Sequence, residues 1–301
     1  MLSNDRKQPF FILGSQRSGT TMLRLMVNSH PRLAVPHETA FMTVFYPRLG
    51  DYGDLSQREN AARLLDDISR HPLVVRGRHI ADREAILAYP ISNFPDLIDA
   101  IMTEYAKAQG KSRWGDKTPY YTPDIDILWR LFPNSKFIHL VRDGRDVALS
   151  LRGISWSSRS IPRLAEDWRW KTTLCHKVGS VLGPDRFLEM KYEDLVRSSE
   201  SCLRRICDFL DEPFAPEMLS YHESAREVVP GESLQWHGNS VRPPDPNKLF
   251  AWKREFSLAD RTIFEQVAGS ALDLFGYERE NLQSSIASKL KNLYYAAIVR
   301  W

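Results

Sequence analysis

The sequence predicts an α/β fold built on a central parallel β-sheet. Three short apolar runs have the composition of buried strands, at residues 9–14, 136–141 and 187–190, and a segment with helical periodicity follows each of them. Strands that alternate with helices in this way are typical of βαβ units, in which the strands run parallel. Hydrophobic residues make up 43% and charged residues 26% of the 301 positions, so the chain can bury a sizeable core. We expect a single domain over residues 1–301.

The other elements follow in chain order. We expect helices at 19–29, 122–132, 143–151, 162–180, 199–210, 257–275 and 281–301, a short extended piece at 33–36, and a return to the core at 113–119. Residues 39–110 have a mostly helical pattern interrupted by four prolines, which predicts a helical insertion over one end of the sheet. Residues 228–250 are rich in Pro, Gly and Asn, and loops of that length are usually functional lids or disordered, so we expect a lid here.

Charge and cysteine content exclude several classes of protein. The net charge of +3 is too small to indicate a nucleic-acid partner. The three cysteines form no CxxC pair, and their odd number argues against a disulfide framework and favours a reducing compartment. The first residues lack the apolar core of a signal peptide, and no apolar run is long enough to span a bilayer. We therefore expect a cytoplasmic protein without a transmembrane segment.

The loop after the first strand has the layout of a phosphate cradle. Gly14 and Gly19 stand five residues apart, and a helical pattern begins directly after Gly19. Backbone N–H groups at a helix N-terminus bind anions, and the helix dipole favours negative charge there. The spacing matches the nucleotide-binding pattern G-x-x-x-x-G-K-[ST], but Thr20 replaces the lysine and Arg17 supplies a cation instead. The sequence therefore predicts a phosphate-like ligand and argues against hydrolysis of ATP or GTP.

A second anion site is predicted at the end of the next long strand. Arg142 follows this strand directly, where open α/β sheets bind ligands, and Ser150 lies about two helical turns further on. A guanidinium in this place can bind a phosphate through two hydrogen bonds. The alternative is that Arg142 and Arg145 pair with Asp143 and Asp146 on a solvated helix start. Two anion sites on neighbouring strands suit a ligand that is phosphorylated at both ends of its ribose.

These motifs together resemble those of a known enzyme family. R-S-G-T-T followed by V-R-D-G-R-D-V-A-L-S is similar to the paired signatures of sulfotransferases that use 3′-phosphoadenosine 5′-phosphosulfate (PAPS). H-P-R-L-A-V-P-H-E-T, D-K-T-P, K-Y-E-D-L-V and W-K-R-E-F-S resemble segments of the tyrosylprotein branch and of the bacterial carbohydrate or lipid branches. The resemblance implies a P-loop, nucleotide-kinase-like three-layer α/β fold, PAPS as donor, 3′-phosphoadenosine 5′-phosphate (PAP) as product, and no metal.

The resemblance also implies a donor site. The residues expected at the 5′-phosphosulfate are Ser15, Gln16, Arg17, Ser18, Gly19, Thr20 and Thr21. Arg142 and Ser150 are expected at the 3′-phosphate. Tyr192 is expected near the nucleotide, although a tyrosine after a strand belongs to the core equally often, and Trp252 with Lys253 is expected to close over it.

Sulfuryl transfer to a hydroxyl group requires a base and a cation. The acceptor hydroxyl has a pKa far above 7, so a base must take its proton during attack. Glu38 is the predicted base, because a glutamate at this separation from the loop arginine has that role in the tyrosylprotein branch; His37 is the second choice. Lys117 matches the family's lysine near the sulfuryl group. The alternatives are a helix-capping role for Glu38 and a surface position for Lys117.

The acceptor is predicted to be partly hydrophobic. Ala40 stands where the tyrosylprotein branch has an arginine that helps to bind acidic peptides, so we disfavour a peptide acceptor. The aromatic residues expected at the acceptor site are Phe41, Phe45, Tyr120, Tyr121 and Trp156. They suit a glycolipid, a carbohydrate, a lipid alcohol or a natural product, although such residues can equally fill the core of the helical insertion. The rival functions are a P-loop kinase-like phosphotransferase and a non-catalytic PAP-binding protein.

The C-terminal segment 281–301 is amphipathic. Ile286, Leu290 and Leu293 fall near one stripe with Ala297 and Arg300. Such a helix packs against the core or a partner subunit in a homo-oligomer, or else lies on a membrane surface. We favour packing over peripheral membrane contact.

Overall fold

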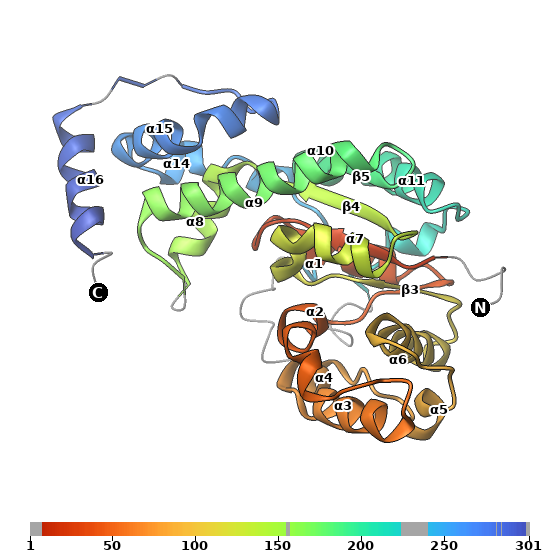
Figure 1. Ribbon diagram of the computed structural model, residues 1–301. Helices are drawn as coiled ribbons and strands as arrows, with labels where there is room; N and C mark the ends of the chain where they lie inside the picture. The colour runs from red at the N-terminus through yellow and green to blue at the C-terminus, as the bar shows by residue number, and fades with distance from the viewer. Residues whose placement is uncertain (1–7, 155–156, 224–239, 281, 284, 299–301) are drawn as a thin grey trace.

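The computed structural model describes residues 8–154, 157–223, 240–280, 282–283 and 285–298, and it contains a five-stranded parallel sheet (Figure 1). The order of the strands across the sheet is β2-β3-β1-β4-β5, and every neighbouring pair is parallel. The strands are β1 Phe10–Leu13, β2 Leu33–Ala34, β3 Arg113–Asp116, β4 Lys136–Val141 and β5 Phe187–Lys191. The predicted α/β class is therefore confirmed.

The central strand is buried on both faces and separates two parts of the core. Side chains alternate along a strand, so successive residues of β1 point to opposite faces of the sheet. Phe10 and Ile12 pack with the apolar residues of α1 (Thr20–Asn28) and α11 (Ser199–Phe209), whereas Phe11 and Leu13 pack with those of α6 (Phe94–Ala108) and α7 (Ile125–Leu131). The sheet thus lies between two helical layers, which explains why β1 is an unbroken apolar run.

The helices outside the insertion agree closely with the predicted segments. Their bounds are α1 Thr20–Asn28, α7 Ile125–Leu131, α8 Gly144–Arg152, α9 Ile161–Leu182, α10 Tyr192–Arg197, α11 Ser199–Phe209, α14 Trp252–Glu255, α15 Leu258–Leu274 and α16 Ile286–Ile298. Three short 3-10 helices accompany them, η2 Pro119–Asp124, η3 Pro216–Met218 and η5 Pro246–Lys248. The short helices α10 and α14 were not predicted, because helices of six and four residues have too few positions to show a period.

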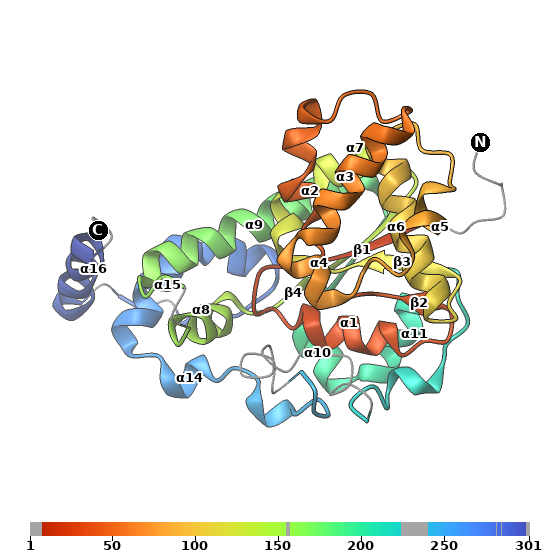
Figure 2. The same ribbon diagram turned by 90° about the horizontal axis from the view of Figure 1, so that it is seen from below.

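The segment between β2 and β3 is helical, as the pattern of residues 39–110 predicts. It contains α2 Phe41–Val44, η1 Tyr46–Asp51, α3 Arg58–Arg70, α4 Pro72–Gly77, α5 Arg83–Leu87 and α6 Phe94–Ala108, with no strand among these fully described residues. Figure 2 shows these helices gathered on one side of the molecule, away from α14, α15 and α16. Whether the chain forms one domain stays a prediction. Most of the predicted lid, residues 228–239, lies outside the described residues.

The C-terminal helix α16 packs through a different flank from the predicted stripe. The Tyr295 hydroxyl and the Lys291 ammonium group donate to Asp260 of α15, at 2.9 and 2.7 Å. Ile286, Leu290 and Leu293, which are 79%, 62% and 67% exposed, point away. Ala297 and Arg300 lie outside the described side chains. The apolar stripe therefore does not face the core of its own chain, whereas packing on a partner subunit and membrane contact stay predictions. No described helix combines the length and hydropathy that are needed to cross a membrane.

Candidate active site

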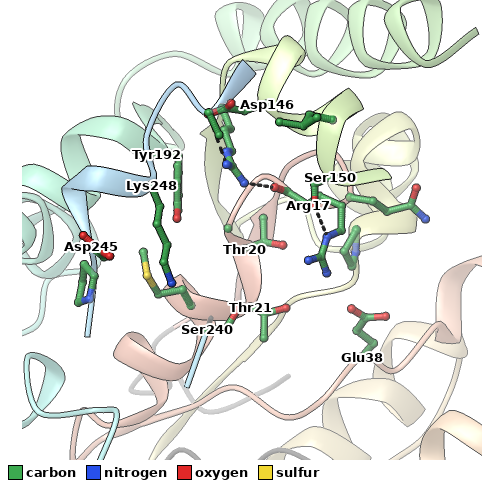
Figure 3. A pocket seen from close by; sticks show the side chains of 18 of the residues that line it. Arg17, Thr20, Thr21, Glu38, Asp146, Ser150, Tyr192, Ser240, Asp245 and Lys248 are labelled. Atoms are coloured by element: carbon green, nitrogen blue, oxygen red, sulfur yellow. Dashed lines mark hydrogen bonds and ion pairs between the residues drawn. The ribbon is translucent and has the colours of Figure 1, made fainter. Parts of the chain in front are cut away.

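A cavity of about 640 Å³ opens at the carboxyl ends of β1 and β4 (Figure 3). The connections from these two strands leave in opposite directions, and ligands of α/β sheets bind at such a point. The predicted site residues that line it are Gln16, Arg17, Gly19, Thr20, Thr21, His37, Glu38, Tyr120, Arg142, Ser150 and Tyr192. The fold therefore brings most of the predicted donor site and the predicted base to one place.

The loop between β1 and α1 is shaped around Gly19 and braced from behind. Gly19 has a φ of +91°, and a Cβ atom there would lie 2.3 Å from the Tyr192 ring. Only glycine combines this backbone conformation with so close a contact. The hydroxyl groups of Ser15 and Ser18 are buried and bond to each other at 2.6 Å. The Ser18 hydroxyl therefore stabilises the loop from inside, and a contact of Ser18 with the 5′-phosphosulfate stays a prediction.

Two arginines and a serine meet beside this loop. The Arg17 Nε donates to the Ser150 Oγ at 3.0 Å, and the Arg142 guanidinium donates to the Arg17 carbonyl oxygen at 3.1 Å. Burial, together with the charge of Arg142, lowers the pKa of Arg17. Two neighbouring guanidinium groups repel each other, so an anion between them would relieve an unfavourable interaction. The geometry is that of an anion-binding site.

Arg142 has hydrogen-bonding capacity to spare. Its guanidinium carbon lies 4.7 Å from the centre of the Tyr192 ring, and one terminal nitrogen lies 3.4 Å from a carboxylate oxygen of Asp146. Its Nε is buried and bonds to none of the described residues. Arg145, in contrast, is fully engaged with Asp143, at 3.0 and 2.9 Å. The alternative of arginine–aspartate pairing thus holds for Arg145 with Asp143 and also for Arg142 with Asp146, although both pairs are largely buried and not solvated.

Glu38 and Lys117 form an ion pair on the other side of the loop. The Lys117 Nζ donates to the Glu38 Oε1 at 2.6 Å and lies 3.5 Å from the Thr21 hydroxyl. Lys117 is 1% exposed, and burial lowers its pKa against the opposing effect of Glu38. Lys117 is therefore no surface residue. Nor does Glu38 cap α2, since the cap position of that helix is Ala40, which has no side-chain cap bond.

Comparison with known proteins identifies the family. Residues 9–216 match the model of the Sulfotransferase family. The chain belongs to this family. A Caenorhabditis briggsae protein named as a candidate protein-tyrosine sulfotransferase is 25% identical over 290 residues, which cover 92% of this chain and 91% of that protein. A protein-tyrosine sulfotransferase of Drosophila melanogaster is 28% identical over 229 residues, which cover 73% of this chain and 42% of the fly enzyme.

A solved structure extends the likeness to the whole fold. The sulfotransferase domain from the olefin synthase of Synechococcus PCC 7002 is similar to this chain, with a TM-score of 0.63 and 28% sequence identity. The similarity covers 91% of this chain and 97% of that domain. The predicted family is therefore confirmed.

His37 lines the cavity of this sulfotransferase next to Glu38. Burial, and then the charge of Lys117, lowers the pKa of His37 to about 3. A ring with so low a pKa stays neutral near pH 7 and accepts a proton less readily than an ordinary histidine. The low pKa of His37 therefore favours Glu38 as the proton acceptor.

Several predicted acceptor residues do not reach the cavity. Phe41, Phe45 and Tyr121 are buried in the core around α6, and the Tyr121 hydroxyl bonds to the Thr39 hydroxyl at 2.9 Å. Trp156 lies outside the described residues. The alternative that these aromatic residues fill the core is thus correct for all the described ones except Tyr120, which is half exposed at the cavity.

Trp252 and Lys253 face away from the cavity. The Trp252 Nε1 donates to Asp143 at 3.0 Å, and the Arg145 guanidinium carbon lies 3.6 Å from the centre of its ring. Both residues line a separate cavity of about 310 Å³. The prediction that they close over the nucleotide is therefore wrong, because buried partners on α8 hold the indole in the core.

The sequence analysis missed other residues that line the active-site cavity. From the segment 240–255, these are Ser240, Pro243, Pro244, Asp245, Lys248, Ala251, Arg254 and Glu255. Figure 3 shows Lys248 extending into the cavity beside Tyr192. Ala251, Arg254 and Glu255 are three and four positions apart, so they share one face of α14. This spacing was the signal that could have found them. From the helical insertion, Leu73 and Arg76 of α4 also reach the cavity.

Proposed function

We propose that this sulfotransferase moves a sulfuryl group from PAPS to the hydroxyl group of a partly hydrophobic acceptor. The observation that supports this most strongly is the shared cavity. It brings the anion-binding loop and Arg142 together with the Glu38–Lys117 pair. An enzyme of this kind needs a donor site and a base within reach of one reacting centre.

The residues present suit a donor with two phosphate-bearing ends. The loop around Gly19 presents the N-terminus of α1 to the cavity, where backbone N–H groups favour a 5′-phosphosulfate. The buried Arg142 Nε lacks a partner among the described residues, and Ser150 lines the same cavity, so a 3′-phosphate has donors available. Arg17 bonds to Ser150 and therefore lies between the two expected ends of the nucleotide.

The chemistry of the step assigns a role to each side chain. PAPS supplies a sulfuryl group whose bond to the 5′-phosphate oxygen breaks as the acceptor oxygen bonds to sulfur. Glu38 takes the acceptor proton through a carboxylate oxygen. Arg17 and the loop N–H groups neutralise the charge that remains on the leaving phosphate. Lys117 fixes the orientation of Glu38 through the 2.6 Å ion pair and borders the loop at Thr21.

The acceptor half of the cavity contains both polar and apolar groups. Tyr120, Pro119 and Leu73 line it together with His37 and Glu38. A lipid alcohol, glycolipid, carbohydrate or natural product with a free hydroxyl fits this combination, and we propose this class of acceptor over a peptide tyrosine.

Transfer from radiolabelled PAPS to a panel of such alcohols tests the proposal. We expect turnover with at least one acceptor. Glu38→Gln should lower kcat by about 10² to 10⁴-fold, the range for a lost general base, and leave PAP affinity within twofold. Glu200→Gln on the exposed face of α11 is the matched control and should keep full activity. Phosphoryl transfer from ATP would establish the kinase alternative, and PAP binding without turnover on any acceptor would establish the non-catalytic one.

A further inference from the structure

The segment that carries the proposed base is held in place from several sides. This segment, residues 35–39, is called the base loop here. At its start, both backbone groups of Val35 bond to side chains of α1: Asn28 accepts from the N–H at 2.9 Å, and Arg24 donates to the carbonyl at 3.1 Å. Asn28 and Arg24 are four residues apart and therefore lie on one face of α1. One end of the base loop is thus fixed to the helix that follows the anion-binding loop.

The other end of the base loop is fixed to the segment after β3. The Thr39 N–H donates to the Thr118 hydroxyl at 3.1 Å, and the Thr39 hydroxyl donates to Asp116. Asp116 is 1% exposed, and burial raises its pKa to about 6. Lys117 lies between Asp116 and Thr118 in the sequence. The same short segment therefore positions both the end of the base loop and the lysine that pairs with Glu38.

The middle of the base loop is fixed by a histidine from the helical insertion. The His79 Nε2 donates to the His37 carbonyl oxygen at 2.9 Å. This carbonyl is part of the peptide bond that joins His37 to Glu38. The His79 ring is fully buried, with ring centres 6.1 Å from Phe41 and 6.0 Å from Tyr105. Its other nitrogen, Nδ1, bonds to none of the described residues.

His79 has the features of a positioning group and not of an acid or base. Burial lowers its pKa to about 4, so the ring is neutral near pH 7. A neutral ring has one N–H, and the bond to the carbonyl requires that hydrogen on Nε2. The ring is packed between Phe41 and Tyr105. Among the described residues, the only hydrogen bond of the His79 ring is therefore the one to the backbone of the base loop.

The end of α4 is built around this ring. The His79 N–H bonds to the Val74 carbonyl at 3.2 Å, which closes the C-terminus of α4. A Cβ atom on Gly77 would lie 2.2 Å from the His79 Nε2, so the glycine leaves room for the ring. The same helix carries Leu73 and Arg76 to the cavity. His79 thus connects a wall of the acceptor half to the base loop.

We propose that His79 is a positioning residue that sets the place of Glu38 relative to the acceptor. The inference rests on the proposed function, in which Glu38 is the base. A displacement of about 1 Å at a reacting group can lower the rate by about 100-fold. Loss of the bond between His79 and the base loop should therefore reduce kcat with little effect on donor binding.

The test compares two histidines at the two ends of α4. His79→Phe keeps an aromatic ring but removes the donor, and we expect kcat with PAPS and octanol, or with the fastest alcohol of the panel, to fall at least tenfold. The KM for the acceptor and the affinity for PAP should change less than twofold. His71→Phe is the control, because His71 packs against Phe45 at 5.8 Å between ring centres and does not contact the base loop. Because His71 is only partly buried, its replacement should lower the melting temperature less than His79→Phe does and should keep kcat.

Two further variants separate the lost bond from a loss of packing. His79→Gln retains an N–H donor and should recover most of kcat, whereas Gly77→Ala should reduce kcat by displacing the ring. If His79→Phe does not fold, the more adaptable His79→Met replaces it. Amide exchange across residues 35–41 gives a readout independent of activity: protection should fall at least tenfold in His79→Phe and not in His71→Phe.

The outcomes distinguish the two proposals. Unchanged kcat and unchanged amide protection in His79→Phe, with an inactive Glu38→Gln, would overturn the role of His79 alone. Equal losses in His79→Phe and His71→Phe would reduce it to ordinary packing. A fully active Glu38→Gln would remove the base assignment, and the role of His79 with it.

Discussion

The ion pair between Lys117 and Glu38 should contribute measurably to stability as well as to chemistry. The two charged atoms are 2.6 Å apart, and the side chains are 2% and 18% exposed. At an effective dielectric constant of about 20, Coulomb's law gives about 6 kcal/mol of attraction at this distance. Desolvation of both groups offsets much of this, but removal of one partner leaves a buried charge, which costs about 3–5 kcal/mol. Lys117→Met and Glu38→Gln should each destabilise the protein.

A double-mutant cycle by urea denaturation measures this coupling. We expect the double variant to be more stable than the sum of the single effects predicts, with a coupling energy of about 2–3 kcal/mol, within the range seen for close charge pairs. The control is the exposed pair Arg130–Asp126 on α7, 3.1 Å apart, for which the coupling should be below about 0.5 kcal/mol. A coupling below about 0.5 kcal/mol for Lys117 and Glu38 as well would refute the reasoning.

Three further predictions address the anion-binding loop, the segment 250–252 and the buried histidine His79. Gly19→Ala should weaken PAP binding, measured by calorimetry, at least tenfold. The control is Gly183→Ala, because Gly183 has a φ of +77° and open space around it, so this variant should only reduce stability. Equal PAP affinity in both variants would contradict the role of the loop. Asp146→Ala removes the acceptor of two backbone N–H groups in residues 250–252. This variant should lower the free energy of urea unfolding by about 2–4 kcal/mol and speed amide exchange in residues 250–252. Unchanged amide exchange would contradict this prediction. The pKa of His79 is about 4 in the folded protein, below the value of 6.5 expected in the unfolded chain. The stabilising effect of the neutral buried ring is therefore present above pH 6.5 and is lost as the pH falls toward 4. The difference of 2.5 pH units corresponds to about 3 kcal/mol, and His79→Phe should lack this part of the pH dependence.

The sequence predicted those features that depend on local pattern. The strands β1 and β4 are buried on both faces, so their sequences are apolar at nearly every position. Such unbroken apolar runs are recognisable in the sequence. The glycine spacing of the first loop survives in the structure for a local reason, the contact of Gly19 with Tyr192. Glu38 follows the carboxyl end of β2 and lines the same cavity as this loop.

Features that depend on tertiary packing could not be predicted in this way. Trp252 is adjacent in sequence to Ala251, which lines the cavity. Its indole nevertheless donates to the buried Asp143, a contact that no local sequence pattern shows. Leu73 and His79 are distant in sequence from every motif, and only the packing of α4 against the base loop brings them to the site. The sequence does not distinguish a phenylalanine that fills the core, as Phe41 and Phe45 do, from one that lines a pocket.

The most direct test of the account is the titration of the protein with PAP and with ATP, followed by thermal unfolding. At a ligand concentration of about one hundred times Kd, binding should stabilise the folded state by about 2.7 kcal/mol, which is readily seen as a shift in melting temperature. The account predicts this shift for PAP in the wild type, its loss in Arg142→Ala, and little or no effect of ATP with Mg²⁺. A larger shift with ATP, or an undiminished PAP shift in Arg142→Ala, would contradict the proposed donor site.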